Sequence, residues 1–128
     1  TSIIGHELDS AKGLLEWFIS QKKVVKGFCN VIYSGVTTNE LSRIIIILLK
    51  LKHISGLYQI SSKPISKYSL ISLIKKIYNI DTKIIKNYII KKKLVLNCEK
   101  FKKGTNVKIS SWISQIKNMK IYHEKHKK

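Results

Sequence analysis

The chain opens with TSIIGHEL (residues 1–8), continues with LLEWFISQ (residues 14–21) and reaches IYSGVTT (residues 32–38). The apolar start predicts a strand over Thr1–Gly5. The second stretch predicts a helix, because its apolar side chains recur on one helical face. A strand, a helix and a further β-rich segment in succession indicate a fold that mixes both kinds of element.

Helix starts are marked by polar residues whose side chains can accept a hydrogen bond from a backbone N–H of the first turn. Such residues precede four apolar runs: Asp9 or Ser10, Thr37, Ser66, and Ser110 or Ser111. The signal at Thr37 is the strongest, because Glu40 follows three residues later and completes a capping box. We therefore expect helices to follow each of these positions.

The remaining segments are richer in β-formers. Residues 24–33 surround Gly27 and predict a short hairpin or two short strands. Strands are expected in Gly56–Ser61 and Asp81–Ile90. A short helical turn over Asn97–Lys103 should end at Gly104.

These elements predict an α/β class with α+β character, in which short strands are packed by about four helices. By length the chain is one domain. We assign the domain to residues 1–121 and a charged, fraying tail to residues 122–128.

The net charge of the chain indicates which kinds of partner it can attract. The chain has 25 Lys and Arg against 7 Asp and Glu, a net charge of +18. Arg43 is its sole arginine, whereas proteins that read nucleic acid usually rely on arginine for bidentate contacts. Abundant Ile, Lys and Asn also fit an AT-rich coding sequence. We expect weak, non-specific polyanion binding, with a small lysine-rich nucleic-acid-binding protein as the alternative.

The sequence gives little support for a membrane span, a disulfide or a metal site. No apolar run reaches the roughly 20 residues of a membrane span, and no signal peptide is visible, so we expect a cytoplasmic location and no membrane partner. Cys29 and Cys98 are expected to be reduced thiols. His123 and His126 have no third ligand nearby, so no metal site is expected.

Catalytic and cofactor-binding motifs are weak or absent in the sequence. No glycine pair has the G-x-G or G-x-x-G spacing that lets backbone N–H groups reach a dinucleotide pyrophosphate. Tyr88 and Lys92 match Tyr-x-x-x-Lys, which a lysine-rich chain produces by chance. His6 and Glu7 follow the first strand, where side chains often face a site, so an acid/base pair is one hypothesis for them and a solvated loop is the alternative.

The three opening stretches, with SGLYQISS (residues 55–62) and PISKY (residues 64–68), resemble extended short-chain dehydrogenase/reductases. The branch is that of the dTDP-4-dehydrorhamnose reductases and related sugar-nucleotide reductases. The resemblance implies the substrate-binding domain of a Rossmann-type reductase without its Rossmann half, incomplete at the N-terminus. The parent reaction would be NAD(P)H-dependent reduction of a 4-keto sugar nucleotide in cell-surface polysaccharide biosynthesis.

The resemblance also implies where substrate contacts lie. The expected substrate-binding residues, which include the His6–Glu7 pair, are Ser2, Ile3, Ile4, Gly5, His6, Glu7, Ser34, Thr37 and Thr38. Thr37 has a competing role as helix cap. Three departures from the family pattern, at Gln59, at Leu94 and before Trp112, predict reduced substrate affinity.

No catalytic, cofactor-binding or metal-binding residue is expected in this chain, although NAD(P) is implied for the parent. The chain alone should be inactive, and a non-functional gene remnant is a further alternative. An unpaired first strand would leave Ile3 and Ile4 facing water or a second copy, so self-association is also expected.

Overall fold

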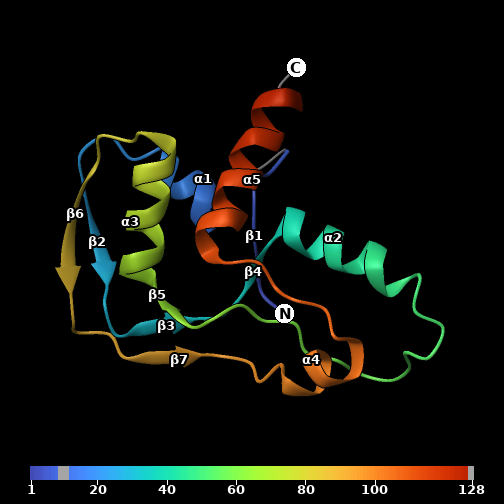
Figure 1. Ribbon diagram of the computed structural model, residues 1–128. Coiled ribbons are helices and arrows are strands. Elements are labelled where there is room, and N and C mark those ends of the chain that lie inside the picture. The colour runs from blue at the N-terminus through green and yellow to red at the C-terminus, as the bar shows by residue number, and fades with distance from the viewer. Residues whose placement is uncertain (9–11, 127–128) are drawn as a thin grey trace.

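The computed structural model describes residues 1–8 and 12–126 and shows short strands surrounded by helices (Figure 1). In chain order the elements are β1 (Ile3–Ile4), α1 (Leu14–Ile19), β2 (Val24–Phe28), β3 (Val31–Tyr33), β4 (Val36–Thr37), α2 (Thr38–Leu48), β5 (Ile65–Ser66), α3 (Lys67–Tyr78), β6 (Lys83–Asn87), β7 (Lys92–Leu94), α4 (Glu99–Thr105) and α5 (Trp112–His126). The mixed α/β class is confirmed. The described residues form five helices, one more than the approximate expectation.

The strands of the described residues pair in three small sheets. β1 pairs with β4 in parallel, with Ile3 opposite Val36. β2 and β6 form a second parallel pair, and β3 lies between β5 and β7 in the third sheet. Figure 1 shows α3 beside the β2–β6 pair, α5 next to α3, and α2 on the other side of β1 and β4.

The main core lies where α1, α3 and α5 meet β2. Its buried side chains include Leu15, Phe18, Ile74 and Ile116. Burying each such side chain contributes roughly 1.5–3 kcal/mol relative to exposure. A smaller cluster beneath α2 and α4 consists of Ile44, Cys98, Phe101 and Val107.

Local capping chemistry starts the helices largely as predicted. Thr37 Oγ1 accepts the N–H of Glu40 (3.3 Å), and Ser66 Oγ accepts the N–H of Ser69 (3.0 Å). Of the two alternatives for the last helix, Ser111 is supported, since its Oγ accepts the N–H of Ser114. Gly13 is the N-cap of α1; the expected caps Asp9 and Ser10 lie outside the described residues.

Several predicted elements were wrong. Gly56–Ser61 forms no strand: Gly56 turns the chain at a φ of 84°, and the residues after it join no ladder. β2 and β3 belong to different sheets, so the hairpin alternative fails and Gly27 lies inside β2. α4 passes through Gly104 and ends at Thr105, and its C-cap Asn106 takes the left-handed conformation.

The segment expected to fray from residue 122 is helical over 122–126, where it continues α5. Lys120 pairs with Glu124 one turn on, and the ring of Tyr122 stacks on that of His126. The division into a domain over residues 1–121 and a charged tail stays a prediction. Residues 127–128 lie outside the described residues.

The open edge of β1 differs from expectation in one respect. Ile3 is 58% exposed, as expected for a strand paired on one side. Ile4 instead points into the main core and is buried. Of these two isoleucines, therefore, Ile3 contributes apolar surface at this edge and Ile4 does not.

Within the described residues, no helix is long and apolar enough to cross a membrane, and no cluster of His, Cys, Asp and Glu is suited to a metal ion. Cys29 and Cys98 are free thiols, as predicted.

Candidate functional site

An open groove of about 1090 Å³ lies where β1 ends, with the first turns of α2 on one side and the last turns of α5 on the other. In Figure 1 these helices stand on either side of that point. Its lining is His6, Glu7, Leu8, Thr38, Asn39, Ser42, Arg43, Ile46, Met119, Tyr122, His123 and His126. We call this the β1 groove. It brings together three predicted site residues: His6, Glu7 and Thr38.

His6 is held rigidly in the wall of this groove. Its Nδ1 lies 2.7 Å from Glu16 Oε1, its Nε2 lies 3.0 Å from the Tyr78 hydroxyl, and the ring of His123 stacks on it with centroids 3.6 Å apart. Burial, together with the Glu16 and Glu124 carboxylates, raises the pKa of Tyr78, so its hydroxyl stays protonated. In a neutral His6, Nε2 can then accept from Tyr78 while Nδ1–H donates to Glu16.

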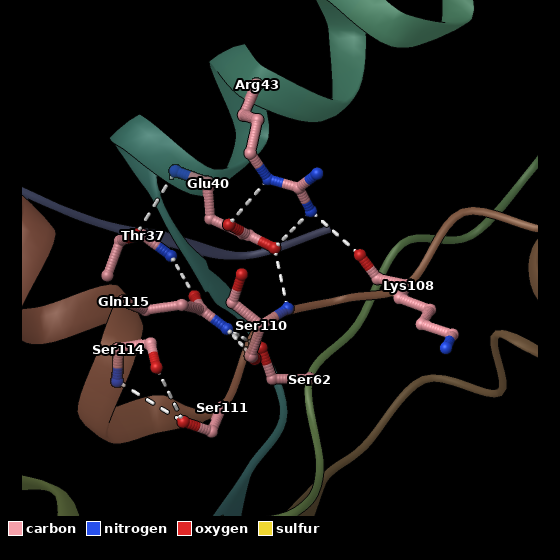
Figure 2. A network of polar contacts seen from close by, with 9 residues as sticks. All are labelled: Thr37, Glu40, Arg43, Ser62, Lys108, Ser110, Ser111, Ser114 and Gln115. Carbon is pink, nitrogen blue, oxygen red and sulfur yellow. Dashed lines mark hydrogen bonds and ion pairs between the residues drawn. The ribbon is translucent and has the colours of Figure 1, made fainter.

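The opposite wall carries the sole arginine. Arg43 donates from Nε to Glu40 Oε2 (3.1 Å) and from Nη2 to Glu40 Oε1 (2.7 Å), and Nη2 also reaches the Lys108 carbonyl (2.8 Å). Figure 2 shows the guanidinium between these partners. The bidentate pair fixes its orientation while much of the side chain stays exposed to the groove.

Glu40 is the buried anchor of that pair. Its Oε1 also accepts the N–H of Ser110 (2.8 Å). Burial alone would raise the pKa of the Glu40 carboxyl, but the hydrogen bonds from Arg43 and Ser110 outweigh burial and lower that pKa. The capping box is therefore only half formed, because this carboxylate does not return to the N–H of Thr37.

The Thr37 N–H is satisfied by a side chain from a distant helix. Gln115 Oε1 accepts it at 2.9 Å, and Gln115 Nε2 donates to Ser62 Oγ (2.7 Å) and to the Ser110 carbonyl (2.8 Å). Figure 2 shows Gln115 between Thr37 and Ser62. This buried amide joins α5, the start of α2 and the loop before β5 into one unit.

The other six predicted site residues lie outside the groove lining: Ile3 and Ile4 in β1, and Ser2, Gly5, Ser34 and Thr37. Ser34 and Thr37 are buried, and Ser34 Oγ accepts the N–H of Leu96 (3.0 Å). Ser2 lies at the exposed edge, where its carbonyl accepts the N–H of Val36 (3.0 Å). Gly5 backs directly onto the Thr38 side chain, and any larger residue there would collide with it.

The residues present do not fit a nicotinamide cofactor. No two glycines have the spacing of a pyrophosphate-binding loop, and Gly27 and Gly35 pack against the side chains of Tyr68 and Tyr33. Tyr88 lies in the loop after β6 and Lys92 begins β7, so no helix presents this pair together.

Comparison with known proteins places the fold. No protein-family profile matches the chain, and no curated protein matches its sequence. A crystal structure of dTDP-4-dehydrorhamnose reductase from Bacillus anthracis in complex with NADP matches with a TM-score of 0.77 and 12% identity, over 94% of this chain and 45% of that one. The chain has the fold of part of these reductases.

Related enzymes give the same result. A dTDP-4-dehydrorhamnose reductase from Clostridium acetobutylicum matches with a TM-score of 0.75 and 16% identity, over 95% of this chain and 46% of that one. UDP-N-acetylglucosamine 4-epimerase from Bacillus cereus matches with a TM-score of 0.69 and 12% identity, over 94% of this chain and 43% of that one. The chain spans less than half of each, and the resemblance drawn from the sequence motifs is confirmed at the level of fold.

Some residues of this reductase-like fold were missed from the sequence. Gln115 had a usable signal, because Trp112, Gln115, Ile116 and Met119 follow the i, i+3, i+4, i+7 spacing of one buried face. Tyr122 and His126 were assigned to a tail and instead line the β1 groove. Arg43 was noted only as the sole arginine, and nothing local indicated its pairing with Lys108.

Proposed function

We propose that this chain forms the substrate-binding portion of a sugar-nucleotide reductase. The complete reaction would be NAD(P)H-dependent reduction of a 4-keto sugar nucleotide for cell-surface polysaccharide biosynthesis. The observation that carries the proposal is the fold match with dTDP-4-dehydrorhamnose reductase over 94% of the chain. Since the chain spans 45% of that enzyme and holds no glycine pair of the required spacing, the nicotinamide would be held by residues outside these 128.

We assign the sugar nucleotide to the β1 groove. Its volume of about 1090 Å³ is at the upper end of what small-molecule sites usually enclose. Thr38, Asn39 and Ser42 offer side-chain hydrogen-bonding groups along one side of α2 to the sugar hydroxyls. The oriented guanidinium of Arg43 suits a diphosphate.

Aromatic surface is available for the base. The Tyr122 ring is 55% exposed and lies in the groove lining. Bases stack on such rings with little dependence on base identity. His6 and Glu7 close the groove at the end of β1, next to the position that the reacting sugar would take at the junction with the cofactor.

The other predicted residues receive different roles in this proposal. Ser34 and Thr37 act as positioning residues, because their side chains are buried and hydrogen-bonded to the backbone. Ser2, Ile3 and Gly5 border the junction with the nicotinamide, and Ile4 anchors β1 in the core.

Calorimetric titration with dTDP-glucose tests the assignment. Arg43→Gln and Thr38→Val should each weaken binding about ten-fold, a loss of about 1.4 kcal/mol. Lys102→Gln, which removes a positive charge on the exposed face of α4, is the matched control and should stay within about two-fold. Equal losses in all three variants, or no saturable binding by the parent chain, would contradict the proposal.

Catalysis is tested separately. We expect the isolated chain to leave NADPH unoxidised in the presence of a 4-keto sugar nucleotide, because no two glycines in its sequence have the spacing of a pyrophosphate-binding loop. Saturable NADPH oxidation by the pure chain would overturn this expectation while leaving sugar-nucleotide binding intact.

A second candidate is polyanion binding. Exposed lysines lie on neighbouring strands β2 and β6 and on β7 at that end of the molecule: Lys26, Lys83, Lys86, Lys92 and Lys93. Each phosphate that a lysine neutralises contributes about −0.9 to the slope of the logarithm of the binding constant against the logarithm of salt concentration. Non-specific binding of a polyanion to these lysines should therefore largely vanish by about 200 mM salt. Sequence-selective DNA or RNA binding that survives this salt would favour the nucleic-acid function.

A further inference from the structure

A second groove lies between α3 and α5, separate from the β1 groove. It has a volume of about 550 Å³ and is lined by Leu73, Lys76, Ile77, Ile113, Lys117, Lys120, Ile121 and Glu124. We call this the α3–α5 groove. Its residues recur at helical spacing on both helices, so it runs lengthwise between them.

The lining of the α3–α5 groove is apolar. Leu73 and Ile77 pack against the main core and form part of the lining. Ile113, in the first turn of α5, is 52% exposed, and Ile121, in the second half of the same helix, is 49% exposed. Two isoleucines placed eight residues apart on one face leave an apolar strip open to water.

The rims of the groove are basic. Lys120 is already engaged: its Nζ donates to the Ile77 carbonyl (3.0 Å) and pairs with Glu124 (3.6 Å). Lys76 and Lys117 are exposed and form no ion pair within the described residues. An apolar strip thus lies between two uncompensated positive charges on opposite helices.

The geometry points to a docking site for an acidic amphipathic helix of a partner protein. Two packed helices form a groove into which a third helix fits, with its apolar side chains towards Ile113 and Ile121. Its flanking Glu or Asp side chains would meet Lys76 and Lys117. The strip from Ile113 to Glu124 covers about 17 Å, which corresponds to about three helical turns of the partner.

Other occupants fit the chemistry less well. A second copy of this chain would bring lysines against lysines, since each copy carries a net charge of +18. Nucleic acid would leave the isoleucines without apolar partners. A membrane surface would suit a protruding apolar face better than a groove between two helices. This docking site is independent of the proposed sugar-nucleotide binding.

Fluorescence anisotropy with a labelled helical peptide tests the site. The probe is an 18-residue amphipathic peptide with leucines on one face and glutamates on both flanks. The comparison peptides are one with lysine in place of glutamate and one of identical composition with scrambled order. The acidic amphipathic peptide should bind saturably with 1:1 stoichiometry, and the other two should bind at least about ten-fold more weakly.

Variants of the chain locate the binding. Ile113→Lys and Lys117→Glu should each weaken binding of the acidic peptide about ten-fold. The matched controls are Ile45→Lys on α2, where Ile45 is 46% exposed, and Lys102→Glu on α4; both should stay within about two-fold. Far-UV circular dichroism confirms that each variant is folded.

Five outcomes would overturn the inference. Equal binding of the scrambled peptide, or equal losses in the controls, would mean diffuse charge attraction. Absence of saturable binding would mean that the groove accepts no such helix. A monomer–dimer equilibrium abolished by Ile113→Lys would assign the groove to a second copy. Binding to phosphatidylserine vesicles that depends on Ile113, without peptide binding, would assign it to a membrane.

Discussion

Replacing Gln115 with methionine removes the amide that joins three parts of the molecule while keeping the side chain's length. Gln115 is 1% exposed, and its amide makes three hydrogen bonds in the structure, to the Thr37 N–H, Ser62 Oγ and the Ser110 carbonyl. At about 1 kcal/mol each, their loss destabilises the fold by about 3 kcal/mol. The Thr37 N–H is then buried without an acceptor. If the measured loss of stability differs from this value, we therefore expect it to be larger.

Urea unfolding at neutral pH measures this change. The fluorescence of Trp112, one turn before Gln115 on α5 and buried, reports on the affected region, and circular dichroism reports on the helices. The unfolding midpoint should fall while its denaturant dependence stays the same. In a thermal scan the loss corresponds to a drop of about 10 °C.

Asn118→Leu is the matched control, an amide replaced by an apolar side chain of similar size on the exposed face of the same helix. It should change stability by no more than about 0.5 kcal/mol. If Gln115→Met also stays within about 0.5 kcal/mol of the parent chain, the reasoning from the buried network is refuted.

Three further outcomes follow from the same contacts. Thr37→Ala should cost about 1 kcal/mol, because the Glu40 N–H loses its acceptor; an unchanged unfolding midpoint would show that the cap is unimportant. The pKa of Glu40 is lower in the folded chain than in the unfolded one, so its contribution is present above the unfolded pKa of about 4.5 and is lost as pH falls through the folded value. Urea titrations at pH 7 and about pH 3 should therefore differ less in Glu40→Gln than in the parent chain, and an identical difference in both would contradict this. Because Ile3 is exposed on an edge paired on one side only, the chain should be monomeric at low salt and associate as salt screens its lysines. Sedimentation should show that Ile3→Lys abolishes this association and that Ile89→Lys, at an exposed position elsewhere, does not; a monomer at every salt concentration would rule it out.

Helix starts could be predicted because their chemistry is local. Thr37 and Ser66 each accept an N–H from three residues further on, and that spacing is visible in the sequence. The strand over Ile3–Ile4 and the one inside Asp81–Ile90 were predictable from apolar and β-branched residues.

Strand pairing could not be predicted in the same way, because a strand needs a partner that is distant in sequence. Gly56–Ser61 has strand-like composition but joins no ladder. Lys92–Leu94 has two lysines in three residues and nevertheless pairs with β3, since an edge strand tolerates charged side chains.

The candidate site was predictable only in part. His6, Glu7 and Thr38 follow or lie near recognisable motifs, and the β1 groove brings them together. The contributions of Arg43 and Tyr122 depend on how α2 and α5 are placed around β1, which no local pattern encodes. On α5 the buried face includes Gln115, whereas Ile113 is 52% exposed.

Binding of a sugar nucleotide in the β1 groove is best tested by mapping the backbone amide resonances of the ¹⁵N-labelled chain during titration with dTDP-glucose. We expect saturable shifts at Thr38, Ser42 and Arg43 that inorganic pyrophosphate at equal concentration does not reproduce. Shifts confined to the lysines of β2 and β6, or equal shifts with pyrophosphate, would contradict it.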